Sequence, residues 1–350
     1  MPGILSHIGT CIPRWVSRSV LVVIVVTLVF GAAAHASVAL LMEEPFGTFG
    51  AINPTGHAAI YLNRVCAESL TRLRPCRQGE FGVVISRYHR VRGYDWIAIP
   101  LIPYLYAVND VSDVPNTMDR EQETELREAY RREYLMDIAP DGKDGEKPKG
   151  DWIQLIGSSY DRTIHGFELN TTPEEDERFI ALFNDRRNIS HFNLFFHNCA
   201  DFSKDVLDAY FPHSIHRNFI ADAGLTTPKQ VARSLVKYGK KHPELEMSAF
   251  VIPQVPGTIK RSHSVDGVIE SLIKSKKYLV PMAVLNPGVA AGLIAAYMTD
   301  GRMSMPKHAA VFNVEEEQFG VGVAHSSTVP SSGGATATSS VVPIRPSSMR

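Results

Sequence analysis

Cys199 and His57 are the residues of this 350-residue chain whose types and surroundings best suit covalent chemistry. Residues 192–196 predict a short buried strand, and from Phe202 to Tyr210 apolar residues recur at helical spacing. Cys199 is therefore expected in the first turn of a helix. There, unpaired backbone N–H groups and the positive end of the helix dipole favour thiolate over thiol.

A thiolate nucleophile needs an imidazole to move its proton and a polar group to hold that imidazole in one tautomer. His57 begins one β-rich run and His89 ends the next. Because those ends of an antiparallel hairpin lie side by side, we expect His89 to orient His57. Arg87 and Ser86 remain alternative orienting residues. Backbone N–H groups at the start of the Cys199 helix are expected to stabilise an oxyanion.

The same side chains allow two other interpretations. One is a zinc site whose ligands would be His57, His89, His197 and Cys199. Zinc sites usually show tight spacings such as C-x2-C or H-x3-H, which these four residues do not have, so we expect no metal and no cofactor. The other is a cell-envelope binding protein that retains the fold without turnover.

The overall charge balance argues against a nucleic-acid partner. The chain carries 36 Lys and Arg residues against 37 Asp and Glu residues, a formal net charge of -1. A nucleic-acid-binding protein usually shows an excess of basic residues. With 44% apolar and 21% charged residues, the composition is that of an ordinary globular protein.

Residues 1–36 are expected to be a targeting segment. Two arginines precede an apolar run at 20–30, and small residues follow it up to Ala36. This order is typical of a signal peptide, with cleavage expected after Ala36. The alternative is an uncleaved anchor, because 20–42 is long enough to span a bilayer. In both cases we expect an exported protein, located in the periplasm or at the cell envelope.

Export changes the expectation for the four cysteines. Cys11 lies in the targeting segment. Cys66 and Cys76 flank a short polar excursion, and in an oxidising compartment they are placed to close it as a disulfide. Cys199 then remains as the free thiol that a nucleophile requires.

The body of the chain is expected to be α+β. Strands or strand-like segments are predicted at 57–64, 81–89, 95–100, 152–157 and 163–169. Helices are predicted at 119–136, 172–187 and 227–241, besides the one that begins at Cys199. The helix at 119–136 carries many acid–base pairs three or four residues apart, and we interpret it as a solvated insertion.

Changes in composition suggest the domain boundaries. They predict a catalytic domain at 43–245 with a helical and loop insertion at 119–150, an extension at 246–310, and a mostly disordered tail at 311–350. The extension contains an uncharged apolar segment at 278–298 that Pro and Gly interrupt. The length of this segment suits a membrane span, whereas its Pro and Gly content suits a kinked hairpin or a buried segment. Membrane contact through 20–42 or 278–298 therefore stays one of two alternatives.

Two short motifs occur in an informative order. They are G-H-A-A-I-Y-L at residues 56–62 and N-C-A-D-F at residues 198–202. Together they resemble the circularly permuted papain-like hydrolases of the NlpC/P60 superfamily, which include lecithin:retinol-acyltransferase-like proteins. The resemblance covers about residues 45–215. The chain departs from the family pattern in the long gap between His57 and the candidate on the second strand.

The resemblance implies a permuted papain-like antiparallel sheet with the nucleophile helix packed against it. It also implies a thiol-dependent amidase, peptidase or acyltransferase that acts on amide, ester or thioester bonds. Cys199 would be the nucleophile, His57 the base, and His89 or a neighbour the third residue. The implied substrate is a peptidoglycan peptide or a lipid, and both alternatives stay open.

Overall fold

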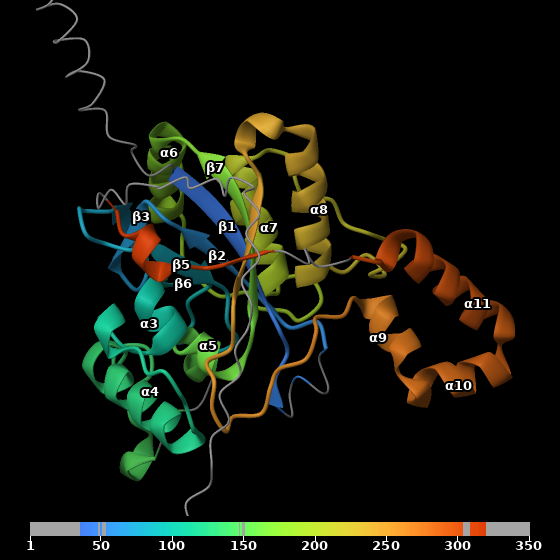
Figure 1. Ribbon diagram of the computed structural model, residues 1–350, viewed down its shortest axis with the longest axis horizontal. Coiled ribbons are helices and arrows are strands. Elements are labelled where there is room, and N and C mark those ends of the chain that lie inside the picture. Colours follow the sequence, from blue (N-terminus) through green and yellow to red (C-terminus); the bar gives the residue numbers. More distant parts are fainter. Residues whose placement is uncertain are drawn as a thin grey trace, which may run out of the picture.

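A seven-stranded mixed sheet, mostly antiparallel, organises the α+β fold (Figure 1). The computed structural model describes residues 36–47, 50, 54–146, 148, 151–303 and 309–319. The strands of this sheet, in spatial order, are β6 (Ile97–Pro100), β5 (Val83–Ser86), β2 (His57–Leu62), β1 (Ala36–Glu43), β7 (Ile164–Thr171), β8 (Ser248–Ile252) and β9 (Ala310–Val311). Only the β8–β9 pair is parallel. A separate hairpin consists of β3 (Val65–Ser69) and β4 (Arg72–Pro75).

Helices account for most of the remaining elements. The α-helices are α3 (Leu101–Tyr106), α4 (Arg120–Tyr134), α5 (Ser158–Asp161), α6 (Pro173–Asp185), α7 (Cys199–Tyr210), α8 (Pro228–Lys241), α9 (Val268–Lys274), α10 (Lys276–Leu285) and α11 (Pro287–Ala296). The shorter elements are the 3-10 helices η1 (Val111–Asp113), η2 (Lys143–Gly145), η3 (Asp151–Leu155), η4 (Pro243–Leu245) and η6 (Val314–Glu317), and the π-helical turn η5 (Tyr297–Gly301).

Both faces of the sheet are buried, which explains the nearly continuous apolar sequence of β1 and β2. Alternate residues of each strand point to opposite faces. Residues such as Leu40 and Ile60 pack against α6, α7 and α8, whereas Leu41 and Tyr61 pack on the face covered by α3, α4 and α5. The head of β2, where His57 lies, therefore has helices on both sides.

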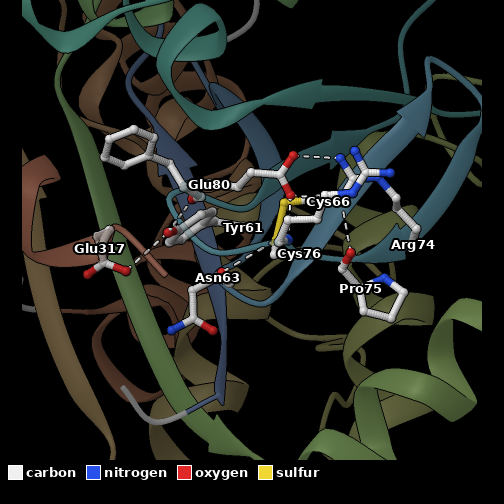
Figure 2. Close-up of a disulfide and its surroundings, with 10 residues drawn as sticks. Tyr61, Asn63, Cys66, Arg74, Pro75, Cys76, Glu80 and Glu317 are labelled. Atoms are coloured by element: carbon white, nitrogen blue, oxygen red, sulfur yellow. Dashed lines mark hydrogen bonds and ion pairs between the residues drawn. A yellow bond between two sulfur atoms is a disulfide. The ribbon is translucent and has the colours of Figure 1, made fainter. Parts of the chain in front are cut away.

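The expected hairpin of the second and third β-rich runs is present. β2 and β5 pair antiparallel, and the excursion between them forms the β3–β4 hairpin. The Cys66–Cys76 disulfide crosses this hairpin, with a distance of 4.9 Å between the two Cα atoms. Figure 2 shows it beside the ion pair of Arg74 with Glu80, whose closest contact is 2.6 Å. Cys199 is the free cysteine among the described residues, as expected.

The charged helix α4 differs from its interpretation as a solvated insertion. Its Glu123 and Arg127 side chains are buried. Arg127 forms ion pairs with Glu123 and with the buried Asp161 of α5. The Arg127 Nη2 atom lies 2.9 Å from the Asp161 carboxylate and 3.1 Å from the Gly157 carbonyl oxygen. Ion pairing satisfies these charges inside the protein, so a polar sequence here does not mean exposure.

Two predicted strands are absent. Residues 152–157 lie mostly in the 3-10 helix η3. Residues 192–196 form no strand, and only an isolated bridge joins Asn193 to His197. The Asn193 side chain accepts a hydrogen bond from the Phe195 N–H at 2.9 Å, a local turn that competes with extended structure. Phe195 and Phe196 are 55% and 56% exposed, so this run is not buried either.

The C-terminal part of the described chain returns to the sheet. β8 and β9 extend the sheet beyond β7, so the predicted boundary at residue 246 does not separate two structural units. Residues 311–319 of the predicted tail lie against the core, where the Phe319 N–H donates to the Glu80 carbonyl oxygen at 2.8 Å. The rest of that predicted tail, 320–350, lies outside the described residues.

The two segments considered for membrane contact, 20–42 and 278–298, lie in different parts of the chain's structure. Residues 36–42 of the predicted 20–42 segment belong to the buried strand β1, and residues 1–35 lie outside the described residues. The other segment, 278–298, forms the hairpin of α10 and α11, which projects from the body in Figure 1. Among the described residues, no helix combines the length and apolar character needed to cross a bilayer.

Candidate functional site

The head of β2 has a free edge because its neighbour β5 is short. β5 ends at Ser86, and its register pairs it only with Ile60, Tyr61 and Leu62. Past this end, the N-terminus of α7 takes the place of a strand, and the backbone of Ala58 makes a hydrogen bond with Cys199. The structure thus brings Cys199 against the residue that follows His57 in the chain.

Asn198 fixes the start of α7. Its Oδ1 atom accepts hydrogen bonds from the Ala200 and Asp201 N–H groups at 2.8 and 3.0 Å. Its Nδ2 group donates to the carbonyl oxygens of Leu194 and Thr226, each at 3.1 Å. The Asp201 side chain returns to the Asn198 N–H, which completes a capping box. This network makes Cys199 the first helical residue, as the sequence predicts.

The His57 imidazole is held by Ser86, one of the alternative orienting residues. The His57 Nε2 atom lies 2.8 Å from the Ser86 Oγ atom, and the same Oγ donates to the Ala58 carbonyl oxygen at 2.8 Å. A serine hydroxyl has a single hydrogen, and a carbonyl oxygen only accepts. The network therefore assigns the imidazole proton to Nε2, and the Nδ1 atom keeps a lone pair that can accept a proton.

Other neighbours of His57 also interact with Cys199. The Tyr88 ring stacks on the imidazole with 4.8 Å between ring centroids. Tyr88 and Cys199 are close enough that the thiolate charge would raise the pKa of the tyrosine. Glu43, the residue opposite His57 in the β1–β2 register, in turn raises the pKa of Cys199. Cys199 and His57 therefore share three neighbours, which are Ala58, Tyr88 and Glu43.

The resting thiol is neutral, which corrects the expectation of a thiolate. Burial raises the pKa of Cys199 to about 11, although backbone hydrogen bonds from Ala58, Ala200 and Cys199 itself lower it. Burial also lowers the pKa of His57 to about 3, with a smaller contribution from the positive charge of Arg162. The helix terminus is present, but desolvation outweighs it because both charged forms lose water.

A buried acid–base pair that the sequence analysis missed lies beside the imidazole. Glu43 is completely buried, and its carboxylate lies 2.8 Å from the Arg162 guanidinium. The Tyr104 hydroxyl donates to the other carboxylate oxygen of Glu43. Burial raises the pKa of Glu43, whereas Arg162 and Tyr104 lower it. In the sequence, the charged residue at the end of the apolar run of β1 could have indicated this buried pair.

His89 does not occupy the predicted orienting position. Its backbone N–H donates to Asp151, and its ring packs against Phe192 with 5.1 Å between centroids. The remaining alternative, Arg87, binds the residue before Cys199, with 3.4 Å between its Nη1 atom and the Asn198 carbonyl oxygen. Among the three candidates, Ser86 is the one that contacts the imidazole.

An open cleft of about 620 Å³ lies where the chain leaves β5, beyond Tyr88 in the sequence. Its lining residues are His89, Arg90, Arg92, Gly93, Ser190, His191 and Phe192. Arg90 and Arg92 have positive φ angles of 60° and 49°, so the chain turns sharply as it leaves β5. Within the described ranges, neither arginine forms an ion pair, and the cleft therefore offers two cationic groups to a ligand.

The four residues considered for zinc are not grouped. In the part of the chain that the structure describes, the one group of three His, Cys, Asp or Glu side chains with metal-like spacing is Cys66, Cys76 and Glu80. Its two cysteines form the disulfide. A sulfur bound in a disulfide is not the thiolate that metals bind, so this group does not constitute a metal site.

The free N–H groups at the start of α7 are fewer than expected. Asn198 occupies those of Ala200 and Asp201, which leaves the Cys199 N–H as the first-turn donor for an oxyanion.

Comparison with known proteins found no family model, no curated protein and no solved structure that matches this chain. The chemistry must therefore be argued from the geometry of the site alone.

Proposed function

We propose that this protein is a thiol-dependent hydrolase or acyltransferase that cleaves an amide, ester or thioester bond. Cys199 is the nucleophile, His57 is the general base, and Ser86 is the positioning residue that holds the imidazole. The observation that carries the proposal is the hydrogen-bond chain from His57 through Ser86 to the Ala58 carbonyl oxygen. It leaves the imidazole with a lone pair on Nδ1 that can accept a proton, next in the chain to Ala58, whose backbone bonds Cys199.

The reaction begins when the Cys199 sulfur attacks the carbonyl carbon of the substrate. The thiol proton moves to the His57 Nδ1 atom, and the C–S bond forms as the carbonyl π electrons move to oxygen. The Cys199 N–H donates a hydrogen bond to that oxyanion. When the tetrahedral intermediate collapses, the bond to the leaving group breaks, and the imidazolium returns its proton to that group. Water or another acceptor then cleaves the thioester, with His57 again as base.

The pKa values support proton transfer during attack rather than a resting ion pair. With the pKa of Cys199 raised to about 11 and that of His57 lowered to about 3, the neutral thiol and neutral imidazole are the stable forms. Attack on the substrate carbonyl must then accompany the transfer, because separating the charges at a buried imidazole and a half-buried thiol is unfavourable. His57 acts here as a general base in the transition state.

The proposal extends to the finer architecture and to the location. We infer a permuted papain-like arrangement, because the histidine strand precedes the cysteine helix in the chain and the helix packs over that strand. We also infer export, since the Cys66–Cys76 disulfide persists in an oxidising compartment.

We infer the substrate class from the open cleft that includes His89. Arg90 and Arg92 line it, and guanidinium groups recognise carboxylates well. We therefore favour a peptide substrate with an acidic group near the scissile bond, as cell-wall peptides have, over a neutral acyl lipid. A neutral phospholipid ester serves as the alternative substrate in the test.

The test is to trap the thioester. The purified chain is incubated with acidic and neutral peptide thioesters and with phospholipid, quenched in acid, and digested for mass spectrometry. Acyl groups should appear on Cys199, with faster turnover of the acidic peptide. Cys199→Ala should abolish turnover, whereas Cys11→Ser, the matched loss of another thiol, should not. Equal binding of peptide by wild type and Cys199→Ala without any turnover would instead indicate a binding protein.

A further inference from the structure

The hairpin of α10 and α11 exposes apolar side chains on all of its sides. In the described part of the chain α10 has no buried residue, and α11 has only Ala290. Exposure is greatest at the tip, where Val284 and Leu285 are 76% and 84% exposed. A helix that is apolar all round is normally buried in a protein core or in a membrane. We therefore expect another surface to pack against the exposed apolar side chains of this hairpin.

The root of the hairpin is fixed to the body. The Lys229 Nζ atom of α8 lies 2.5 Å from the Glu270 carboxylate of α9, and both side chains are buried. The Tyr297 hydroxyl, just after α11, donates to the same carboxylate at 3.2 Å. The Ile269 N–H donates to the Ala221 carbonyl oxygen at 3.2 Å. The body thus holds the root, while the tip projects away from the sheet, as Figure 1 shows.

Charges flank the apolar hairpin but do not interrupt it. Residues 278–299 contain no Asp, Glu, Lys or Arg, whereas Lys276 and Lys277 come immediately before. Lys276 and Lys277 form no ion pair within the described ranges, although Lys277 lies over the Tyr278 ring at 5.7 Å. Lysines beside an apolar insertion are typical of segments that bind anionic lipid surfaces.

A second basic surface lies near the root. A groove of about 540 Å³ beside α8 is lined by Arg217, Phe219, Ile220, Arg233, Lys237 and Lys241, among others. Phe219 is 78% exposed, and its loop is the one whose Ala221 carbonyl bonds α9. This groove therefore combines cationic side chains with the exposed apolar ring of Phe219, although Arg217 is paired with Asp201.

The length of the hairpin decides how a membrane would hold it. Each of the two helices has ten residues, about 15 Å at the usual rise. A bilayer core is about 30 Å thick, so neither helix can span it. Interfacial helices enter only about 5–10 Å, which suits the exposed tip at Val284 and Leu285.

We propose that the α10–α11 hairpin inserts its tip into one leaflet of an anionic lipid membrane. Lys276 and Lys277 bind the headgroups, and the apolar tip enters the acyl boundary. This surface acts independently of Cys199, so it stands whether or not the thiol is catalytic. A dimer that covers the hairpin with a second copy is the competing outcome that the experiment separates.

The experiment places an environment-sensitive fluorophore at the tip of the full-length chain. Leu285→Cys is labelled in a Cys11→Ser, Cys199→Ala background, which leaves the disulfide intact. Ile153→Cys, at a residue that is 43% exposed on η3, is the matched control. Vesicles contain either phosphatidylcholine alone or phosphatidylcholine with phosphatidylglycerol, with and without a lipid-borne quencher. The label reports its own position, so a membrane interaction of residues 20–30 does not produce the signal.

The label at 285 should brighten with anionic vesicles and lose that signal to the quencher, while the label at 153 changes in neither case. Each lysine near an anionic surface strengthens binding about fivefold, so Lys276→Glu with Lys277→Glu should weaken vesicle binding by well over tenfold. The proposal is overturned if the 285 label ignores the lipid quencher. It is also overturned if that label brightens with protein concentration in the absence of vesicles, which would identify a second copy as the cover.

Discussion

The Ser86 hydroxyl accepts a hydrogen bond from the Nε2–H group of His57 at 2.8 Å and donates one to the Ala58 carbonyl oxygen at 2.8 Å. Because Ala58 also contacts Cys199, one backbone residue links the imidazole, its orienting hydroxyl and the thiol. This chain fixes the ring in one tautomer before any substrate binds. The following predictions depend on that geometry and on the burial around it.

Ser86→Ala should lower kcat by on the order of 10²-fold while KM changes little, because general-base catalysis depends on a correctly oriented imidazole. Without the hydroxyl the imidazole can flip or change tautomer, so Nδ1 is no longer the proton acceptor in every molecule. Ser86→Thr keeps the hydroxyl and should recover most of the activity. Steady-state kinetics with the acidic peptide thioester as substrate measures kcat and KM for both variants. Equal loss in both variants would point to a packing defect instead of an orienting role.

Alkylation of Cys199 in the folded protein should accelerate continuously with pH through neutrality. Burial raises the pKa of this thiol to about 11, so the thiolate fraction grows about tenfold per pH unit below that value. Iodoacetamide labelling, followed by intact mass between pH 6 and 10, measures the rate. In denaturant the same cysteine should titrate near its ordinary pKa of about 8.5. A rate that is already maximal at pH 7 would show a resting thiolate and contradict this prediction.

Acid should destabilise the fold through His57. Its pKa is lowered to about 3 in the folded protein, whereas the unfolded chain binds the proton near pH 6.5. Between those values the unfolded state holds more protons, so the free energy of unfolding falls as pH decreases. At pH 4.5 this protonation of the unfolded chain lowers the free energy of unfolding by about 3 kcal/mol, taking about 1.4 kcal/mol per pH unit below 6.5.

Denaturant unfolding of wild type and His57→Gln at pH 7.5 and 4.5 isolates that contribution. The variant cannot take up the proton, so its loss of stability between the two pH values should be smaller. His242, an exposed histidine paired with Glu244, provides the control, and His242→Gln should behave as wild type. Parallel losses in wild type and His57→Gln would refute the assignment of the acid effect to this residue.

Removing the charge of Glu43 should destabilise the protein strongly. Glu43→Gln leaves the Arg162 guanidinium buried without its carboxylate partner, and breaking such a pair usually costs about 3–5 kcal/mol. Arg132→Ala is the matched control, because its pair with Glu128 is exposed and should contribute less than about 1 kcal/mol. Chemical denaturation at pH 7.5 measures both. Similar small effects for both variants would contradict a buried ion pair at the site.

Residues close together in the sequence predict the start of α7, the helix that begins at Cys199. Asn198 and Asp201 have the spacing of a capping box, which is formed within four residues and needs no tertiary contact. The same holds for Thr172 before Pro173, which caps α6 as predicted. The β2–β5 hairpin and its crosslink were also predictable, because the cysteines lie close in sequence on either side of a turn.

Tertiary structure decided which residue orients His57. The sequence alone favoured His89, but β5 ends at Ser86, and a left-handed Arg90 turns the chain away from the sheet. The length of a short strand depends on pairing across the sheet, here with β2 and β6, and not on its own residues. Ser86 therefore lies at the imidazole, and His89 lies in the cleft.

Burial was likewise decided by the fold, and it reversed two expectations. Cys199 begins a helix as the sequence indicated, yet its pKa is raised because the surrounding sheet and helices exclude water. Leu194, Phe195 and Phe196 are apolar but exposed, because the turn at Asn193 leaves them outside both cores. Sequence specifies side-chain chemistry and local caps, whereas solvent exclusion arises only when distant segments pack together.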